Sequence, residues 1–379
     1  MKVLSVVGAR PQFIKLSPVD TALRQAGHEH IIVHTGQHYA PELSDSLFQD
    51  LAIPEPDVNL DVRSGSHARQ TATMMTGLEE VFAHVRPDWV LVYGDTNSTL
   101  AASITAVKMH LLLAHLEAGL RSGNRAMPEE HNRVVTDHVS DLLLAPTETA
   151  MRHLADEGLA FRSVKVGDVM ADVCYQVRDR TTLNPPSMPQ GWLDSADVIL
   201  TTLHRAENTD DPKRLDYLLT KLGELTSPVV LVAHPRLIAK VQEHGIRLDR
   251  GQITTISSMT YSQMVYAVGQ ARGVITDSGG LQKEAFLLDT PCITARTETE
   301  WPETLADGWN IIDPQLTHDA QLQFSRSREP RRTHPFGLGD AAQLVVRELS
   351  NVERAKFLCR VNLGQGYPST QVDQTPPRS

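Results

Sequence analysis

The stretch WVLVYGDTNST, residues 89–99, decides the fold class of this chain. A continuous apolar run occupies residues 89–93, and Gly94 and Asp95 follow it directly, ahead of a predicted helix. Apolar runs of this length are typical of strands buried on both faces, as in parallel sheets. The stretch therefore predicts a βα unit with a polar turn between its strand and its helix.

Similar runs rich in Val, Ile and Leu recur every few dozen residues, separated by longer segments with helical apolar spacing. This alternation predicts βαβ units and an α/β fold. In the first half of the chain the predicted strands are residues 3–7, 30–34, 89–93, 111–116, 142–145 and 164–166. In the second half they are residues 198–202, 229–233, 253–256, 273–276, 292–295 and 311–312. The two series predict two Rossmann-like domains, each with a doubly wound parallel sheet.

The chain length agrees with two domains, because 379 residues exceed the size at which a single core usually stops growing. A break is expected at TTLNPPSMPQG, residues 181–191, whose three prolines forbid a regular ladder. The predicted division is an N-terminal domain at 1–180, a linker at 181–192, a C-terminal domain at 193–338, and a helix with a loosely ordered tail at 339–379.

Composition excludes several classes of protein. The chain is 41% hydrophobic and 22% charged, and it lacks an apolar run of the roughly 20 residues that a membrane span needs. A net charge of −10 argues against a general nucleic-acid surface. The start of the chain does not resemble a signal peptide, and the three cysteines form no metal or disulfide pattern, so we expect a cytoplasmic protein.

Polar residues cluster where the predicted strands end, which is where open α/β sheets bind ligands. Asp95 follows one strand, although capping of the next helix explains it equally well. Glu117 follows a nearly continuous apolar run and would be costly to bury unpaired. Glu129 and Arg133 have the i,i+4 spacing of an ordinary surface ion pair. His204 could equally belong to a hydrogen-bonded loop cluster. The functional prediction therefore depends on all four residues lying together at the strand ends.

The segment DSGGLQKEA, residues 277–285, lies where a strand is followed by a helix. Paired glycines let backbone N–H groups approach a phosphate at the positive end of a helix, which predicts a diphosphate site, although an ordinary turn has the same pattern. The first loop, GARPQFIK at 8–15, is not a dinucleotide fingerprint, and no metal motif is present. We therefore predict no cofactor and no metal, with Arg10 and Lys15 contacting phosphate or the leaving group.

In order along the chain, seven motifs resemble those of the non-hydrolysing UDP-N-acetylglucosamine 2-epimerase family. They are GARPQFIK, VYGDTNST, AHLEAGLRS, MPEEHNR, TLHRAEN, DSGGLQKE and TETEWPE. The resemblance implies a GT-B-like fold, with two Rossmann-like domains facing a central cleft, UDP held mainly by the C-terminal domain, and a homodimer. It also implies a role in making precursors of cell-surface polysaccharides.

The chemistry that the resemblance implies is elimination of UDP to a 2-acetamidoglucal, reprotonation of C2 from the other face, and re-addition of UDP. This reaction needs a base, an acid and cationic support for the diphosphate. Matched motif by motif, the implied acid/base and positioning residues are Asp95, Glu117, Glu129 and His204. The implied substrate and UDP-binding residues are Arg10, Lys15, Arg133, Ser278, Gly279, Gly280 and Glu284.

Two substrates remain open. Gln12, Trp301 and the short segment SGNRAMPEE, residues 122–130, look more like the branch that acts on UDP-2,3-diacetamido-2,3-dideoxyglucuronic acid. In that case Arg125 would face the substrate carboxylate, although a solvent-facing arginine is the simpler interpretation. The loop GQHYAPELSD, residues 36–45, leaves allosteric activation by the substrate undecided.

Three other functions share parts of this pattern. A GT-B glycosyltransferase would have the same architecture and a C-terminal UDP site, and a hydrolysing 2-epimerase would use the same residues for its first half-reaction. A nucleotide-sugar-binding regulator would need no acid/base residues at all. The three acidic residues at strand ends and loops of the N-terminal domain favour proton chemistry.

Overall fold

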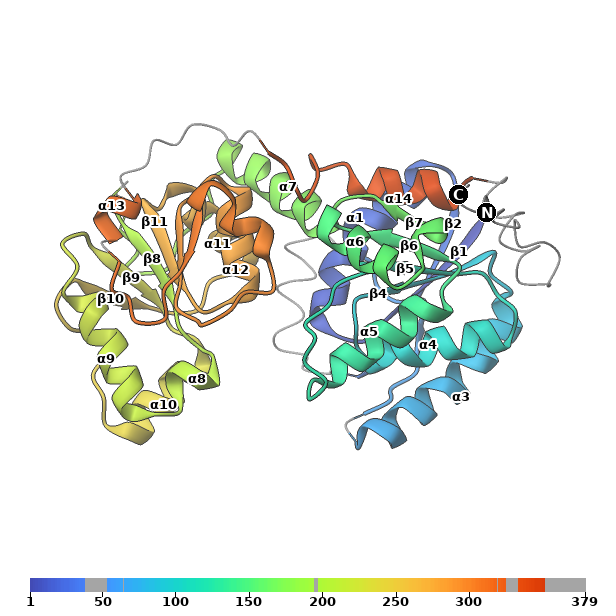
Figure 1. Cartoon of the computed structure of the whole chain (residues 1–379), viewed down its shortest axis with the longest axis horizontal. Helices are drawn as coiled ribbons and strands as arrows, with labels where there is room; N and C mark the ends of the chain where they lie inside the picture. The colour runs from blue at the N-terminus through green and yellow to red at the C-terminus, as the bar shows by residue number, and fades with distance from the viewer. Residues whose placement is uncertain (38–52, 64, 194–196, 319, 325–332, 352–379) are drawn as a thin grey trace, which may run out of the picture.

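The computed structural model describes residues 1–37, 53–63, 65–193, 197–318, 320–324 and 333–351. Two parallel β-sheets, each covered by helices, form two domains that lie side by side (Figure 1). No helix in the described part of the chain combines the length and apolar character that a membrane crossing needs.

The first sheet has the strand order β3-β2-β1-β4-β5-β6-β7 within the described residues. Its strands are β1 (Lys2–Val7), β2 (Glu29–His34), β3 (Val58–Asn59), β4 (Trp89–Tyr93), β5 (Leu113–Leu116), β6 (Leu142–Ala145) and β7 (Ser163–Lys165). The chain order reverses between β1 and β4, which are parallel neighbours. Ligands of such sheets bind outside the carboxyl ends of the strands at this reversal.

In the second sheet the order is β10-β9-β8-β11-β12-β13 over the residues described. Its strands are β8 (Ile199–Thr202), β9 (Val229–Val232), β10 (Ile253–Ile256), β11 (Gly273–Thr276), β12 (Cys292–Thr294) and β13 (Asn310–Ile312). Its reversal lies between the parallel neighbours β8 and β11. Both domains therefore repeat one doubly wound plan, and the predicted fold class is confirmed.

Helices cover both faces of each sheet. The α-helices are α1 (Arg10–Gln25), α3 (His67–Val85), α4 (Asn97–Lys108), α5 (Pro128–Val139), α6 (Glu148–Asp156), α7 (Val169–Leu183), α8 (Ala206–Thr209), α9 (Pro212–Gly223), α10 (Pro235–His244), α11 (Tyr261–Gln270), α12 (Gly279–Leu287), α13 (Ala320–Phe324) and α14 (Ala341–Leu349). Two 3-10 helices are η1 (Ala160–Arg162) and η2 (Pro302–Gly308).

The alternation of side chains along the strands explains this layering. In β1, Val3 and Val7 pack into the same core as α1, α7 and α14, whereas Leu4 and Val6 pack against α3 and α4. Successive side chains of a strand point to opposite faces, so a strand with an apolar residue at every position needs a helical layer on each side. Burial on both faces therefore explains the apolar runs in the sequence.

Every strand predicted from the sequence overlaps an observed strand. Strand β3 was not predicted, because its two residues, Val58 and Asn59, form no apolar run and pair with β2 at the edge of the sheet. Its position in the sheet comes from pairing of Val33 with Val58 rather than from its own composition.

Two segments connect the domains. Helix α7 packs against α1 and α14 on one side and against α11 and α12 on the other, and it ends inside the segment predicted as linker (Figure 1). The chain later returns to the first domain, where α14 packs against α1 and the carbonyl of Leu349 accepts a hydrogen bond from the indole of Trp89 at 3.1 Å. The predicted tail beyond residue 351 lies outside the described residues.

Candidate functional site

The side chain of Gln12 holds the loop after β1 in place. Its Oε1 accepts hydrogen bonds from the backbone N–H groups of Gly8 at 2.8 Å and Ala9 at 3.0 Å. Its Nε2 donates to the carbonyl of Tyr93, 2.7 Å away at the end of β4. Gln12 is 2% exposed, so it joins the loops of two adjacent strands. Arg10 begins α1, but its side chain lies outside the described part of the chain.

Lys15 of α1 forms an ion pair with Glu117, the residue that follows β5. Gly94 lies directly beside the pair, since a Cβ there would be 3.4 Å from Oε2 of Glu117 and 3.6 Å from Nζ of Lys15. Burial by itself lowers the pKa of Lys15, but the negative charges of Glu117, Asp168 and Asp95 outweigh burial and raise it above its usual value. Lys15 is therefore a persistent cation beside two of the predicted acid/base carboxylates.

Glu117 has an unusual backbone conformation, with a φ of 75°. Residues other than glycine rarely adopt this left-handed region, and doing so costs on the order of 1–3 kcal/mol. The N–H groups of Glu117 and Ala118 both donate to the carbonyl of Leu144 in β6, at 3.1 and 3.2 Å, which holds the turn. Strain of this kind is often found at functional sites, and here it turns the chain sharply at the carboxyl end of β5.

Asp95 does not cap the helix that follows it. Thr96 is the N-cap of α4, and its Oγ1 accepts a hydrogen bond from the N–H of Thr99 at 3.3 Å. The carboxylate of Asp95 forms an ion pair with Arg133 of α5 instead. Since β4 and β5 are adjacent strands, Asp95 and Glu117 reach the same edge of the first sheet, each with its own cation.

Two neighbouring glutamates at the start of α5 have different surroundings. Glu130 is buried and accepts hydrogen bonds from the N–H groups of Ser122 at 3.0 Å and Gly123 at 2.9 Å. Arg133 lies 3.2 Å from Glu130 and also pairs with Asp95, so these two acids, and not the i,i+4 residue Glu129, hold it. Glu129 itself is exposed, which leaves its carboxylate accessible at the surface.

Beneath these residues is a buried network that the sequence analysis missed. Nδ1 of His115 in β5 forms a hydrogen bond with the carboxylate of Asp137 at 2.6 Å, and Nε2 donates to the carbonyl of Gly94 at 2.7 Å. Asp137 also accepts a hydrogen bond from the N–H of Gly119 and pairs with Arg121 at 2.7 Å. The network supports both sides of the Glu117 turn. Its sequence signal was a single histidine within an apolar strand, at AHLEAGLRS.

In the second domain, Asp277 organises the loop that carries His204. Its carboxylate accepts hydrogen bonds from the N–H groups of His204 and Arg205 at 3.0 Å, and from Nδ2 of Asn208 at 3.1 Å. Nδ1 of His204 lies 3.2 Å from the same carboxylate. Burial raises the pKa of Asp277, but the hydrogen bonds from His204 and Asn208 outweigh it and hold the pKa below its usual value. The carboxylate is therefore ionised and orients the imidazole of His204.

A cavity of about 490 Å³ opens at the reversal point between β8 and β11. Among the residues that line it are His204, His234, Tyr261, Ser278, Gly280 and Glu284. Ser278 is the N-cap of α12, so the positive end of this helix points toward the cavity. A Cβ at Gly280 would meet nothing closer than Oγ of Ser278 at 3.9 Å, whereas at Gly279 it would lie 3.2 Å from Oε2 of Glu300. The predicted diphosphate loop and His204 thus share one cavity.

Glu284 borders the same cavity one turn along α12. Burial raises the pKa of its carboxyl, and the charge of Lys283 and the hydroxyl of Tyr261 only partly offset this. A buried carboxyl beside a cavity is suited to accept hydrogen bonds from ligand hydroxyl groups, such as the two of a ribose.

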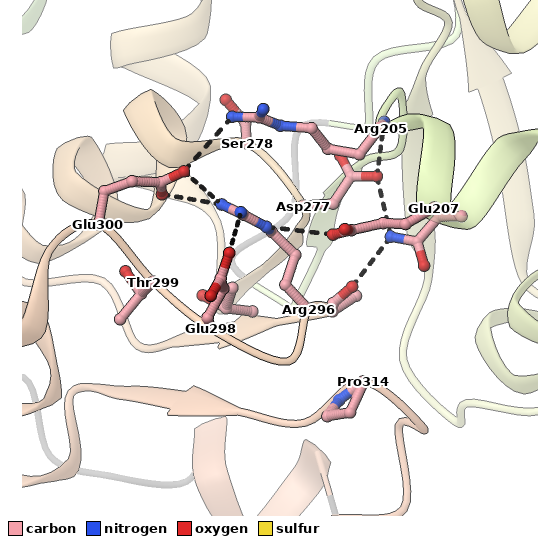
Figure 2. A network of polar contacts seen from close by, with 12 residues as sticks. Arg205, Glu207, Asp277, Ser278, Arg296, Glu298, Thr299, Glu300 and Pro314 are labelled. Carbon is pink, nitrogen blue, oxygen red and sulfur yellow. Dashed lines mark hydrogen bonds and ion pairs between the residues drawn. The ribbon is translucent and has the colours of Figure 1, made fainter. Parts of the chain in front are cut away.

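Arg296 organises a second polar network next to the start of α12 (Figure 2). Its guanidinium contacts Glu300 at 2.8 Å and Glu207 at 3.2 Å, and Glu300 in turn lies 3.9 Å from Arg205. Figure 2 shows these side chains converging beside Asp277 and Ser278. The network fixes the TETEW segment, which the sequence analysis recognised only as a motif, against the loop that carries His204.

Comparisons with known proteins show the family of this chain. The model of the UDP-N-acetylglucosamine 2-epimerase family matches residues 21–350. This chain belongs to that family. A UDP-N-acetylglucosamine 2-epimerase homolog of Methanococcus maripaludis is 40% identical over 358 residues, spanning 93% of this chain and 100% of the relative. A UDP-2,3-diacetamido-2,3-dideoxy-D-glucuronate 2-epimerase of Pseudomonas aeruginosa is 45% identical over 319 residues, spanning 82% of this chain and 88% of the relative.

Solved structures extend the comparison. The UDP-N-acetylglucosamine 2-epimerase of Methanocaldococcus jannaschii, in complex with UDP-GlcNAc and UDP, matches with a TM-score of 0.76 at 35% identity, over 92% of this chain and 99% of that one. A lipopolysaccharide outer core galactosyltransferase matches with a TM-score of 0.51 at 13% identity, over 97% of this chain and 100% of that one, which shows the shared GT-B-like fold alone. The protein is a UDP-sugar 2-epimerase, and the resemblance seen in its motifs is confirmed.

The epimerase is expected to keep its activity after metal chelation. Among the described residues, no group of three or more His, Cys, Asp and Glu side chains could hold a metal ion. We therefore expect equal epimerisation rates before and after dialysis against EDTA, measured by NMR of the UDP-sugar. Loss of activity that added Mg²⁺ or Mn²⁺ restores would contradict this expectation.

Proposed function

We propose that this enzyme inverts C2 of UDP-2,3-diacetamido-2,3-dideoxyglucuronic acid by eliminating and re-adding UDP. The identity of 45% to a 2-epimerase of this nucleotide sugar, against 40% to a UDP-N-acetylglucosamine 2-epimerase homolog and 36% to a UDP-N-acetylglucosamine 2-epimerase, supports the substrate. The two side chains that suggested this branch, Gln12 and Trp301, are both buried. We assign both a positioning role, through the loops that they hold.

The proposed reaction begins with removal of the proton on C2 by a carboxylate. The electron pair of the C2–H bond forms a C1=C2 double bond as the bond from C1 to the UDP oxygen breaks, and UDP leaves with the electron pair of that C1–O bond. The glycal is then protonated at C2 from the opposite face, and the UDP oxygen re-adds to C1. Atoms and charge balance over the cycle, so the enzyme needs only one base, one acid and support for the diphosphate.

The arrangement that carries the proposal is the pair of carboxylates at one sheet edge, each matched with a cation. Asp95 with Arg133, and Glu117 with Lys15, lie at the carboxyl ends of adjacent strands. We assign acid/base and positioning work to Asp95, Glu117, Glu129 and His204. Lys15, Arg133 and Arg10 provide positive charge. In the second domain, the N-terminal end of α12, with Ser278, Gly279 and Gly280, holds the diphosphate of UDP, and Glu284 holds the ribose.

The value of kcat/KM for UDP-2,3-diacetamido-2,3-dideoxyglucuronic acid is expected to exceed that for UDP-N-acetylglucosamine by about tenfold or more. A site built for a carboxylate and a second acetamido group loses these contacts with the simpler sugar. UDP-2,3-diacetamido-2,3-dideoxyglucose, which lacks only the carboxylate, separates the two contributions. A higher kcat/KM for UDP-N-acetylglucosamine would reverse the proposed substrate while leaving the reaction class intact.

The same assay in deuterated water tests the reaction class. Epimerisation with retention of UDP should place deuterium at C2, and NMR follows both events at once. A hydrolysing 2-epimerase would instead release UDP and free sugar, and a glycosyltransferase would show neither exchange nor release without an acceptor.

A further inference from the structure

The two chain crossings between the domains meet at Asp168. This residue is the N-cap of α7, and its carboxylate accepts a hydrogen bond from the N–H of Met170 at 2.8 Å. Its own N–H donates to the carbonyl of Phe336 at 2.9 Å, in the segment that returns to the first domain. Asp168 is therefore bonded at once to the outgoing helix and to the returning chain.

Lys283 reaches this point from α12 of the second domain. Its Nζ lies 2.6 Å from the carboxylate of Asp168, and the two side chains are 5% and 2% exposed. The same ammonium group lies 3.8 Å from the centre of the Trp301 ring, which packs against Phe336 at 5.7 Å. A buried lysine is costly without a partner, and here Asp168 and the face of Trp301 surround it.

Both members of this ion pair lie near residues of the candidate site. On α12, Lys283 stands between the cavity residues Gly280 and Glu284. In the first domain, the charges of Asp168 and Lys15 act on each other, raising the pKa of Lys15 and contributing to the lowered pKa of Asp168, and Lys15 is paired with Glu117. Glu117, Lys15, Asp168 and Lys283 therefore form a series of alternating negative and positive charges that joins the two domains.

We propose that Lys283 and Asp168 are positioning residues, whose ion pair sets the place of α12 and its UDP-binding end relative to Lys15 and Glu117. This inference rests on the proposed sites for UDP and for acid/base chemistry. Elimination requires the C2 base and the groups around the diphosphate to hold one geometry, although they come from different domains. A misplacement of about 1 Å can cost on the order of 100-fold in rate.

The test compares Asp168→Asn, Lys283→Met and the double variant. Each single variant leaves one buried charge unpaired, so we expect Tm to fall by on the order of 10 °C. The double variant removes both charges, and its Tm should recover. We expect its kcat to remain at least about tenfold below that of the wild type, with the Kd for UDP within about threefold by calorimetry.

The matched control is the exposed ion pair of Lys165 with Glu148 in the first domain. Lys165→Met with Glu148→Gln makes the same chemical change at a solvent-exposed pair and should leave kcat, Tm and the Kd for UDP unchanged. Lys283→Arg keeps the charge and should retain more activity than Lys283→Met.

Two results would overturn the proposal. A folded double variant with normal kcat would show that the pair contributes stability alone. Equal losses in kcat and in UDP affinity would show that Lys283 shapes the UDP site itself. All rates are measured on whichever UDP-sugar the wild type epimerises, so a wrong assignment of the sugar does not affect the outcome.

Discussion

Glu117→Gln is expected to lower kcat by about 100-fold to 10,000-fold, which is about 3–5 kcal/mol of barrier, while the Kd for UDP stays nearly unchanged. Glu117 stands in a strained turn at the carboxyl end of β5, paired with Lys15, whereas the candidate UDP cavity belongs to the other domain. The amide keeps the size of the side chain and removes its capacity to take up a proton. Asp95→Asn and Glu129→Gln are expected to behave in the same way.

The assay for these variants is deuterium incorporation at C2 together with release of UDP and glycal. A variant without the base should show no deuterium at C2 and no release of UDP or glycal. A variant without the reprotonating acid should still release UDP and the glycal. Because Glu117→Gln leaves Lys15 without its partner, Tm is measured for each protein and rates are taken well below it. Glu148→Gln, at an exposed ion pair, is the control for a carboxylate-to-amide change. Three folded variants with near-normal epimerisation would show that these carboxylates are structural.

Gly280→Val is expected to weaken UDP binding by about tenfold to 100-fold, the equivalent of losing one charge-assisted hydrogen bond or slightly more. Gly280 lines the cavity at the start of α12, and a Cβ there meets no protein atom closer than 3.9 Å. A Cβ therefore fits the folded protein, and the valine methyl groups beyond it would occupy the space through which a phosphate approaches the start of α12. Calorimetry with UDP measures the change.

Gly269 provides the control for this substitution. It lies in α11, and a Cβ at this position meets nothing within 4 Å. Gly269→Ala should leave UDP affinity unchanged. If Gly280→Val folds with wild-type Tm and binds UDP normally, the diphosphate does not lie at this end of α12.

Strands were predicted correctly from the sequence where burial on both faces requires a run of apolar residues. In β4 every residue is buried, so the strand reads as an unbroken apolar run, and the same holds for β6 and β9. Strand β3 was missed because Val58 and Asn59 are partly exposed at a sheet edge, where pairing with β2 and not composition makes the strand.

Within the candidate site, sequence patterns named residues but not their partners. The spacing of MPEEHNR suggested that Arg133 pairs with Glu129, whereas Arg133 pairs with Asp95 and Glu130. Asp95 was equally compatible with a helix cap, and the cap is Thr96. Spacing along a helix shows which of its own side chains can meet. It gives no information about an acid such as Asp95, which another part of the fold brings to the same arginine.

The sequence by itself therefore determined the doubly wound architecture, the family, and the polar loops at the carboxyl ends of the strands. These features follow from local chemistry, because apolar runs, glycine pairs and motif order are properties of short segments. Tertiary structure alone decided which charges meet. Lys15 and Glu117, or Lys283 and Asp168, are more than 100 positions apart along the chain. Folding of the first domain brings Lys15 to Glu117, and packing of α12 against α7 brings Lys283 to Asp168.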